Sequence, residues 1–240
     1  MLRTTCNKLP LTSLLLYRAQ FSGADYEQYT HTAYERHRAE VAAVLTAYRE
    51  SLVQLAAPCA AVKDYPPHVL SNLTYFHLQY EMEDTTDGFH FMCESCSQLQ
   101  SLKITCLRPV GFLAAVGENP AALPRLSYLK IWTFEGLNTA QRDGLITFVE
   151  SKKRLRCFDY SDDCSSNAQT IVPLLSALRS LPTLRVMGID VAIGSEGVFR
   201  TFIDHIPRHV TALCLSIEYR GGDAHQPDTL LSGLVSSSRL

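Results

Sequence analysis

The sequence lacks an excess of charge of either sign, and it lacks any long hydrophobic run. Its 240 residues carry 22 Lys and Arg against 24 Asp and Glu, a formal net charge of −2. Nucleic-acid binding depends on a basic surface, so this balance argues against nucleic acid as a partner. A helix that spans a membrane needs roughly 20 consecutive apolar residues, and the apolar stretches here are much shorter. We therefore expect neither nucleic acid nor a membrane as a partner.

The sequence also lacks the short motifs that mark common enzyme sites. It contains no GxxxxGK[ST], no GxGxxG after a strand, no HExxH and no GxSxG. The segment CESC, from Cys93 to Cys96, is one CxxC without a second pair, which is weak evidence for zinc. In YSDDCSS, residues 160–166, Asp162 and Asp163 are adjacent and point apart, as in an ordinary turn. We expect no catalytic residues, no cofactor and no metal; a hydrolase or metal enzyme using YSDDCSS is the alternative.

The amino terminus and the cysteines bear on the cellular compartment. The apolar segment from Leu9 to Tyr17 is interrupted by Pro10, Thr12 and Ser13. It is typical of a buried β-strand, and a secretory signal peptide is the alternative interpretation. The eight cysteines are scattered, and several lie in apolar periodic phrases where a free cysteine packs as a small hydrophobic residue. We expect an intracellular protein, cytoplasmic or nuclear.

What the sequence does contain is a repeated phrase of the form LxxLxL. Six copies are present, and all of their template positions are apolar or aromatic. Their first positions are separated by 26, 27, 29, 29 and 26 residues. The copies are Leu73/Phe76/Leu78, Leu99/Leu102/Ile104, Leu126/Leu129/Ile131, Leu155/Phe158/Tyr160, Leu184/Met187/Ile189 and Val210/Leu213/Leu215. A fixed period of this length indicates stacked structural units.

Each step of the repeat has room for one strand, one helix and two short connections. Asn138 with Gln141, and Ser195, are predicted to begin helices between strands. Strands joined through a helix lie parallel, and such crossovers are right-handed. The sequence therefore predicts an α/β fold in which each unit buries its LxxLxL side against its helix and its neighbours.

These phrases resemble leucine-rich-repeat proteins of the longer-repeat kind, similar to ribonuclease inhibitor, over residues 70–218. The resemblance implies an α/β solenoid with parallel strands on the concave face, helices outside and a right-handed course. The family usually carries Asn or Cys three positions after the last template residue. Here those positions are Glu81, Leu107, Phe134, Asp163, Ala192 and Glu218. We therefore expect irregular turns at these points.

The two ends of the array differ from its middle. Residues 1–69 are predicted to supply a leading strand, one long helix over residues 25–57 and a linker, which together cap the array. An apolar seam along that helix predicts packing on its own domain, with a coiled-coil partner as the alternative. Residues 70–240 form the predicted solenoid. A further unit begins near its end without a polar cap, so we expect a chain truncated at the C-terminus, a fragment of something longer.

Function is expected on the strand residues that lie between template positions. Residues alternate sides along a strand, so these face the open inner surface of the curve. Large aromatic side chains mixed with cations are typical of protein-binding hot spots. The candidate partner-binding residues are Tyr75, His77, Lys103, Tyr128, Lys130, Trp132, Asp159 and Asp190. The sequence thus predicts a protein-interaction module rather than an enzyme, with Trp132 as the first residue to substitute.

The variable periods and phrases such as LPRLSYLKI resemble the repeat region of divergent fungal F-box/leucine-rich-repeat proteins. This resemblance implies the substrate-recognition region of an F-box-type ubiquitin-ligase adaptor. In that family a short helical F-box ahead of the repeats binds a Skp1-type adaptor. No F-box is found in this chain, so the Skp1-type partner depends on an F-box upstream. A free-standing leucine-rich-repeat scaffold without a ligase role is the alternative.

Overall fold

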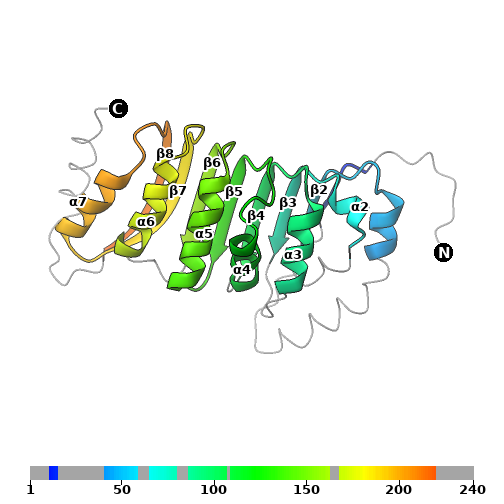
Figure 1. Cartoon of the computed structure of the whole chain (residues 1–240), viewed down its shortest axis with the longest axis horizontal. Coiled ribbons are helices and arrows are strands. Elements are labelled where there is room, and N and C mark those ends of the chain that lie inside the picture. Colours follow the sequence, from blue (N-terminus) through cyan, green and yellow to red (C-terminus); the bar gives the residue numbers. More distant parts are fainter. Residues whose placement is uncertain are drawn as a thin grey trace.

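The computed structural model describes residues 11–15, 41–58, 65–79, 86–106, 109–162 and 168–219. Within these ranges the chain forms one eight-stranded sheet whose strand order follows the chain (Figure 1). Every neighbouring pair of strands is parallel, which confirms the α/β class with parallel strands. The strands are β1 Ser13–Leu15, β2 Gln54–Pro58, β3 Tyr75–Gln79, β4 Ser101–Cys106, β5 Tyr128–Thr133, β6 Cys157–Asp162, β7 Val186–Ile193 and β8 Ala212–Tyr219.

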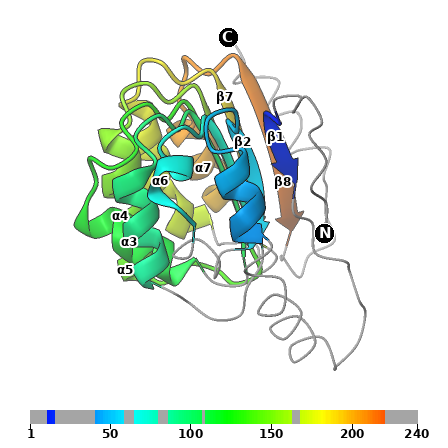
Figure 2. The same cartoon turned by 90° about the vertical axis from the view of Figure 1, so that its right-hand side faces the viewer.

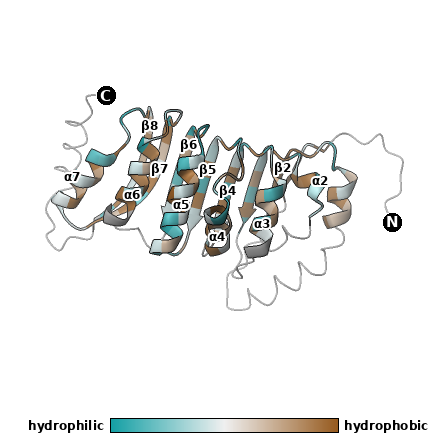
Figure 3. Ribbon diagram, viewed as in Figure 1, coloured by the Kyte–Doolittle hydropathy of each residue, from teal (hydrophilic) through white to brown (hydrophobic). Residues whose placement is uncertain are grey.

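The helices cover one face of this sheet and lie side by side in chain order (Figures 1 and 2). They are α2 Pro67–Leu70, α3 Thr86–Ser95, α4 Val110–Glu118, α5 Thr139–Ser151, α6 Ala168–Arg179 and α7 Glu196–His205. Residues 41–47 are also helical. Hydrophobic and hydrophilic residues alternate along α5 and α6 (Figure 3). Such amphipathic helices bury one side against the sheet and expose the other.

A row of apolar side chains crosses the helix-covered face of the sheet. The row, paired position by position from β3 to β8, consists of Phe76, Leu102, Leu129, Phe158, Met187 and Leu213. The first five are fully buried, whereas Leu213 on β8 is 40% exposed. Burial of each such side chain contributes about 1.5–3 kcal/mol, so the row is a main source of stability. The predicted register of the six phrases is confirmed.

A second repeated feature connects the beginning of each strand to the preceding strand. Two consecutive backbone N–H groups donate to one carbonyl oxygen; Ser127 and Tyr128, for example, donate to Gln100 O at 2.8 and 3.0 Å. The accepting residues, from the first step to the last, are Thr12, Val53, Thr74, Gln100, Ser127, Arg156 and Arg185. Each occupies the same position of its unit, directly after the first template residue. The units therefore repeat in their backbone bonding as well as in their apolar pattern.

The prediction of one helix over residues 25–57 is wrong at its C-terminal end. Residues 41–47 are helical, but residues 54–58 form β2, which pairs with β1 and β3. Leu52, Leu55 and Ala57 form a further copy of the phrase, and all three are fully buried. This copy was not recognised in the sequence because its third template position is Ala57 and because residues 25–57 contain no Gly or Pro, which is typical of a helix. Pairing on both sides outweighs the local helical preference of the segment.

The predicted ends of the chain are only partly described. Leu14 of β1 pairs with Leu55, so the leading strand is confirmed at the residues that are described. Leu45 lies on the helical residues 41–47 and is fully buried, whereas Leu52 precedes β2 and Leu55 belongs to it, so the predicted apolar seam does not continue along one helix. Residues 25–40 of the predicted helix and residues 220–240, which contain the predicted further unit, lie outside the described residues.

Both predicted helix starts are confirmed. The side chain of Asn138 accepts a hydrogen bond from the backbone of Gln141 at 2.9 Å, and the Gln141 side chain accepts one from the Asn138 backbone at 2.8 Å. Ser195 caps α7 by accepting a bond from the backbone of Val198. These caps satisfy N–H groups that a helix start leaves without partners.

The last two strands extend past the template positions of their phrases. β7 and β8 continue as strands through Ala192 and Glu218, which lie three positions after the last template residue of their phrases. The two strands consequently pair over their full lengths, from Val186 with Ala212 to Ile193 with Tyr219.

Candidate functional site: the strand face

The face of the sheet opposite the helices carries the eight predicted residues in three rows, here called the strand face. The central row contains His77, Lys103, Lys130, Asp159 and Gly188 on β3 to β7. The row nearer the strand starts contains Tyr75, Ser101, Tyr128 and Cys157. The row nearer the strand ends contains Gln79, Thr105, Trp132 and Ser161, with Asp190 on β7 beside Ser161. Parallel in-register pairing brings these side chains together from five units of the repeat.

An ion pair occupies the middle of the central row. Lys130 Nζ lies 2.5 Å from Asp159 Oδ2, and the two side chains are 30% and 28% exposed. Burial lowers the pKa of Lys130, but the hydrogen bond and the charge of Asp159 outweigh burial and raise it. The carboxylate lies over Gly188, where an added Cβ would be 2.8 Å from Asp159 Oδ1. Glycine at this position therefore makes room for the acidic partner of Lys130.

Lys103 is the neighbouring cation in the same row, paired in register with His77 on one side and Lys130 on the other. Among the described residues, no carboxylate forms an ion pair with it. Burial and the charge of Lys130 lower the pKa of Lys103, and Asp159 opposes them. An anion that binds here would offset the cost of keeping Lys103 charged, which arises from its partial burial and from the neighbouring cation. Lys103 is thus the position of the strand face best suited to receive a carboxylate.

His77 is held as a neutral side chain beneath this surface. Its side chain is only 7% exposed, and burial, followed by the charge of Lys103, lowers its pKa from 6.5 to about 4. Gln79 Nε2 donates to His77 Nδ1 at 3.4 Å, so Nδ1 accepts. His77 Nε2 therefore carries the proton and donates to Thr105 Oγ1 at 3.2 Å. His77 positions its neighbours and offers little surface to a partner.

Aromatic rings lie on both sides of the central row. Tyr75 and Tyr128 flank Ser101 in the row nearer the strand starts, and both are half-buried. Trp132 is half-buried in the other row and packs on Phe134, with ring centroids 5.0 Å apart. Rings held by neighbours present rigid apolar surface, which is what protein-binding hot spots use.

Asp190, the last predicted contact residue, lies at the far end of the strand face. Its Oδ2 accepts a hydrogen bond from the Ser161 hydroxyl. Both acidic residues of the face are therefore engaged within it, Asp159 by a cation and Asp190 by a hydroxyl. Lys103 is therefore the charged residue among those predicted that has no oppositely charged or hydrogen-bonded side-chain partner within the described part of the face.

Cys93, Cys96 and Asp162, which belong to the two motifs considered for metal binding, are buried. Cys93 and Cys96 are buried, and burial raises the pKa of the Cys93 thiol to about 12 and that of Cys96 further. Asp162 is 2% exposed and accepts a hydrogen bond from Tyr160 at 2.9 Å, while Asp163 lies outside the described residues. No group of three His, Cys, Asp or Glu within the described ranges could hold a metal ion.

Lys152 is a buried cation that serves the fold rather than a site. It follows α5, is 2% exposed, and donates to the carbonyl oxygens of Pro120, at 2.6 Å, and Ala122. Its ammonium also lies 4.2 Å from the centroid of the Phe148 ring. Burial lowers the pKa of Lys152 to about 8, with the nearby Cys93 thiol opposing. Its hydrogen bonds tie the end of α5 to the loop after α4.

Comparison with known proteins adds no relative to this description. No protein-family model matches the chain, and no curated protein matches it significantly. In the part of the chain that the structure describes, no helix has the length and apolar character needed to cross a membrane.

Sequence reasoning gave no role to several residues of the strand face, among them Thr105 and Gly188. Thr105 fixes the His77 ring, and Gly188 admits the Asp159 carboxylate. Both lie at intervening positions of the repeat, so their place on the face was predictable. Their roles depend on cross-strand neighbours 28 and 29 residues away, which the sequence pattern alone does not identify.

Proposed function

We propose that the chain is a leucine-rich-repeat solenoid with a right-handed course, its strands on the concave face and its helices outside. The uninterrupted apolar row and the repeated carbonyl acceptor support this proposal, because both recur at the same position of successive units. Stacked units of one strand and one helix each bury a continuous core that none of them could bury alone.

We further propose that this chain is a binding module rather than an enzyme and that its strand face binds a partner protein. The observation that carries this proposal is Lys103, a partly buried cation with no carboxylate partner among the described residues, in a row flanked by aromatic rings. Tyr75, Tyr128 and Trp132 supply apolar contact area around it. The partner segment is expected to present an acidic side chain for Lys103 with apolar groups on either side.

The cellular role proposed for this module is substrate recognition in an F-box-type ubiquitin ligase, in the cytoplasm or nucleus. The proposal rests on the resemblance of the repeat phrases and on the binding surface described above. Co-purification of a Skp1-type adaptor with the protein expressed from its full gene would support the ligase role. Recovery of one constant partner without that adaptor would favour the scaffold role instead.

Proximity labelling in cells of the source organism tests the strand face directly. Lys103→Glu reverses the charge at the proposed contact, and Trp132→Ala removes apolar area beside it. Lys153→Glu is the matched control, because Lys153 is an exposed lysine outside the strand face. We expect Lys103→Glu and Trp132→Ala to lose the specific partner and Lys153→Glu to retain it. If all three variants fold and recover the same partners as the wild type, the contact surface lies elsewhere.

A further inference from the structure

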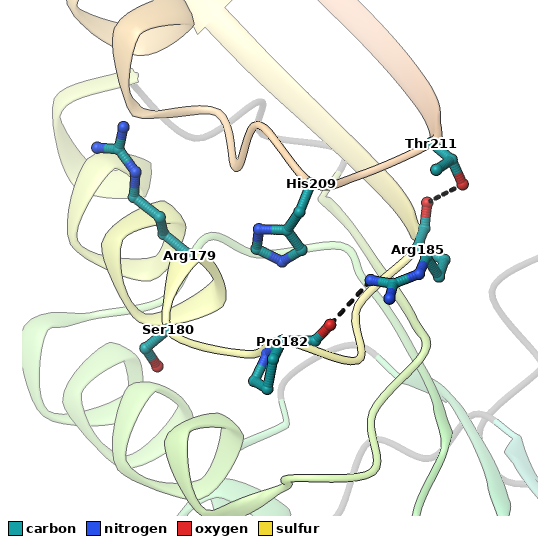
Figure 4. Close-up of a pocket in the computed structure, with 6 residues that line it drawn as sticks. All are labelled: Arg179, Ser180, Pro182, Arg185, His209 and Thr211. Carbon is teal, nitrogen blue, oxygen red and sulfur yellow. Dashed lines mark hydrogen bonds between the residues drawn. The ribbon is translucent and has the colours of Figure 1, made fainter. Parts of the chain in front are cut away.

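A basic pocket of about 530 Å³ lies where α6 and α7 lead into β7 and β8, apart from the three rows of the strand face (Figure 4). It is lined by Arg179, Ser180, Pro182, Arg185, His209 and Thr211. No acidic side chain contributes to this lining, and two of its residues are arginines. The pocket volume falls within the range of roughly 300–1,000 Å³ that is typical of small-molecule sites. The pocket is therefore larger than one tetrahedral anion.

His209 distinguishes this pocket from the corresponding point of the preceding unit. In the preceding unit, Thr183 occupies the position that His209 occupies here, directly before the first template residue. The Thr183 hydroxyl lies 2.9 and 2.8 Å from the carbonyl oxygens of Lys153 and Leu155, and so bonds to the backbone of the unit before it. His209 makes no equivalent bond. Its Nε2 is buried and has no hydrogen-bond partner among the described residues.

The carbonyl oxygens that His209 would otherwise meet are occupied by an arginine. Arg185 Nη1 donates to Pro182 O at 2.9 Å and to Leu184 O at 2.8 Å, and Figure 4 shows the first of these bonds beside the His209 ring. These two bonds hold the Arg185 guanidinium in place through Nη1, and its other N–H groups take no part in them. His209 Nε2 is therefore left without these two acceptors and without any other hydrogen-bond partner among the described residues.

Arg179 adds a second cation at the last residue of α6. It forms no ion pair or hydrogen bond with another described residue, and its side chain is exposed. Figure 4 shows the His209 ring between the Arg179 and Arg185 side chains. The Ser180 and Thr211 hydroxyls already donate to Ala177 O and Arg185 O, so recognition depends on the three nitrogen-bearing side chains.

We propose that this pocket binds a phosphate monoester through Arg179, Arg185 and His209. Guanidinium groups match the geometry of phosphate oxygens and form charge-assisted hydrogen bonds with them. Because Arg179, Arg185 and Thr211 are exposed, the pocket is open to solvent and admits a phosphorylated side chain carried by a protein segment. The inference does not depend on the strand face, since the two sets of residues share no member.

Fluorescence anisotropy of a labelled peptide with one phosphoserine and uncharged flanking residues tests the proposal. The unphosphorylated peptide is the ligand control, and inorganic phosphate and free phosphoserine serve as competitors. Arg179→Gln and His209→Gln are the test variants. Arg208→Gln is the matched control, because Arg208 is exposed beside His209 and does not line the pocket. Thermal unfolding of each variant establishes that it is folded.

We expect the phosphopeptide to bind and the unphosphorylated peptide not to bind. Either test variant should weaken the affinity for the phosphopeptide about tenfold or more, and Arg208→Gln should change it less than twofold. Free phosphoserine competing as well as the peptide would support the phosphate site and assign it to small phosphorylated molecules instead of protein. Absence of binding by every phosphate probe would overturn the proposal. Equal weakening by Arg208→Gln would also overturn it, since the interaction would then reflect general surface charge.

Discussion

The free energy of unfolding is expected to fall as the pH decreases from 6.5 toward 4, because of His77. The buried ring has its pKa lowered from 6.5 to about 4, by burial and then by the charge of Lys103. Between these values the unfolded chain binds a proton at this side chain and the folded chain does not. Stability from the neutral ring is therefore complete above pH 6.5 and is lost as the pH falls toward 4.

The size of the effect follows from the same shift. A pKa lowered from 6.5 to about 4 corresponds to about 3 kcal/mol at about 1.36 kcal/mol per pH unit. The hydrogen bonds agree with this direction, because protonation of Nδ1 removes the acceptor for Gln79. An effect of this size is a large fraction of the total stability of a domain, commonly about 5–15 kcal/mol.

Urea denaturation at several pH values between 4 and 7, followed by circular dichroism, measures this contribution. His77→Gln removes the titrating group and keeps polar atoms near Thr105 and Gln79. The variant should lose less stability than the wild type across this pH range, by about 2–3 kcal/mol. His68→Gln, at an exposed histidine of α2, controls for the loss of a histidine as such. Parallel pH profiles for wild type and His77→Gln would refute the reasoning.

Two further predictions concern a helix start and the strand face. Asn138→Ala removes the capping box of α5 and should lower the free energy of unfolding by about 1 kcal/mol, measured by urea denaturation; no change would mean that the cap is dispensable. Gly188→Ala should displace the Asp159 carboxylate and so lower the pKa of Lys130, which a faster acylation of Lys130 would report. Asp159→Asn should do the same without the steric contact, and unchanged reactivity in both variants would contradict the assigned pairing.

The framework of the fold was predictable because it depends on period and alternation. Six strands and their shared register follow from the spacing of apolar residues, and the start of α5 follows from Asn138 and Gln141. β2 was not predicted, because its phrase ends in Ala57 and its segment has helix-compatible composition. Only pairing with Leu14 on one side and Phe76 on the other identifies it as a strand.

The strand face was predictable in membership but not in chemistry. Alternation assigned all eight residues to one surface, and the register then placed Lys130 beside Asp159. The hydrogen bonds of the His77 ring depend on the side-chain conformations of Gln79 and Thr105. Such contacts combine rotamers from neighbouring units, and a periodic pattern carries no information about rotamers.

The regularity of the backbone gives its exceptions their significance. The starts of β2 to β8 are held by the same pair of backbone hydrogen bonds, and the middles of β3 to β7 by one fully buried apolar row. The side chains opposite the helices take part neither in these backbone bonds nor in this buried row. Gly188 lies opposite the helices, and His209 lies shortly before the start of β8. The first opens space for a charge pair, and the second leaves a buried nitrogen unused between two arginines. Binding at the proposed surfaces would give both residues a role that packing of the core does not give them.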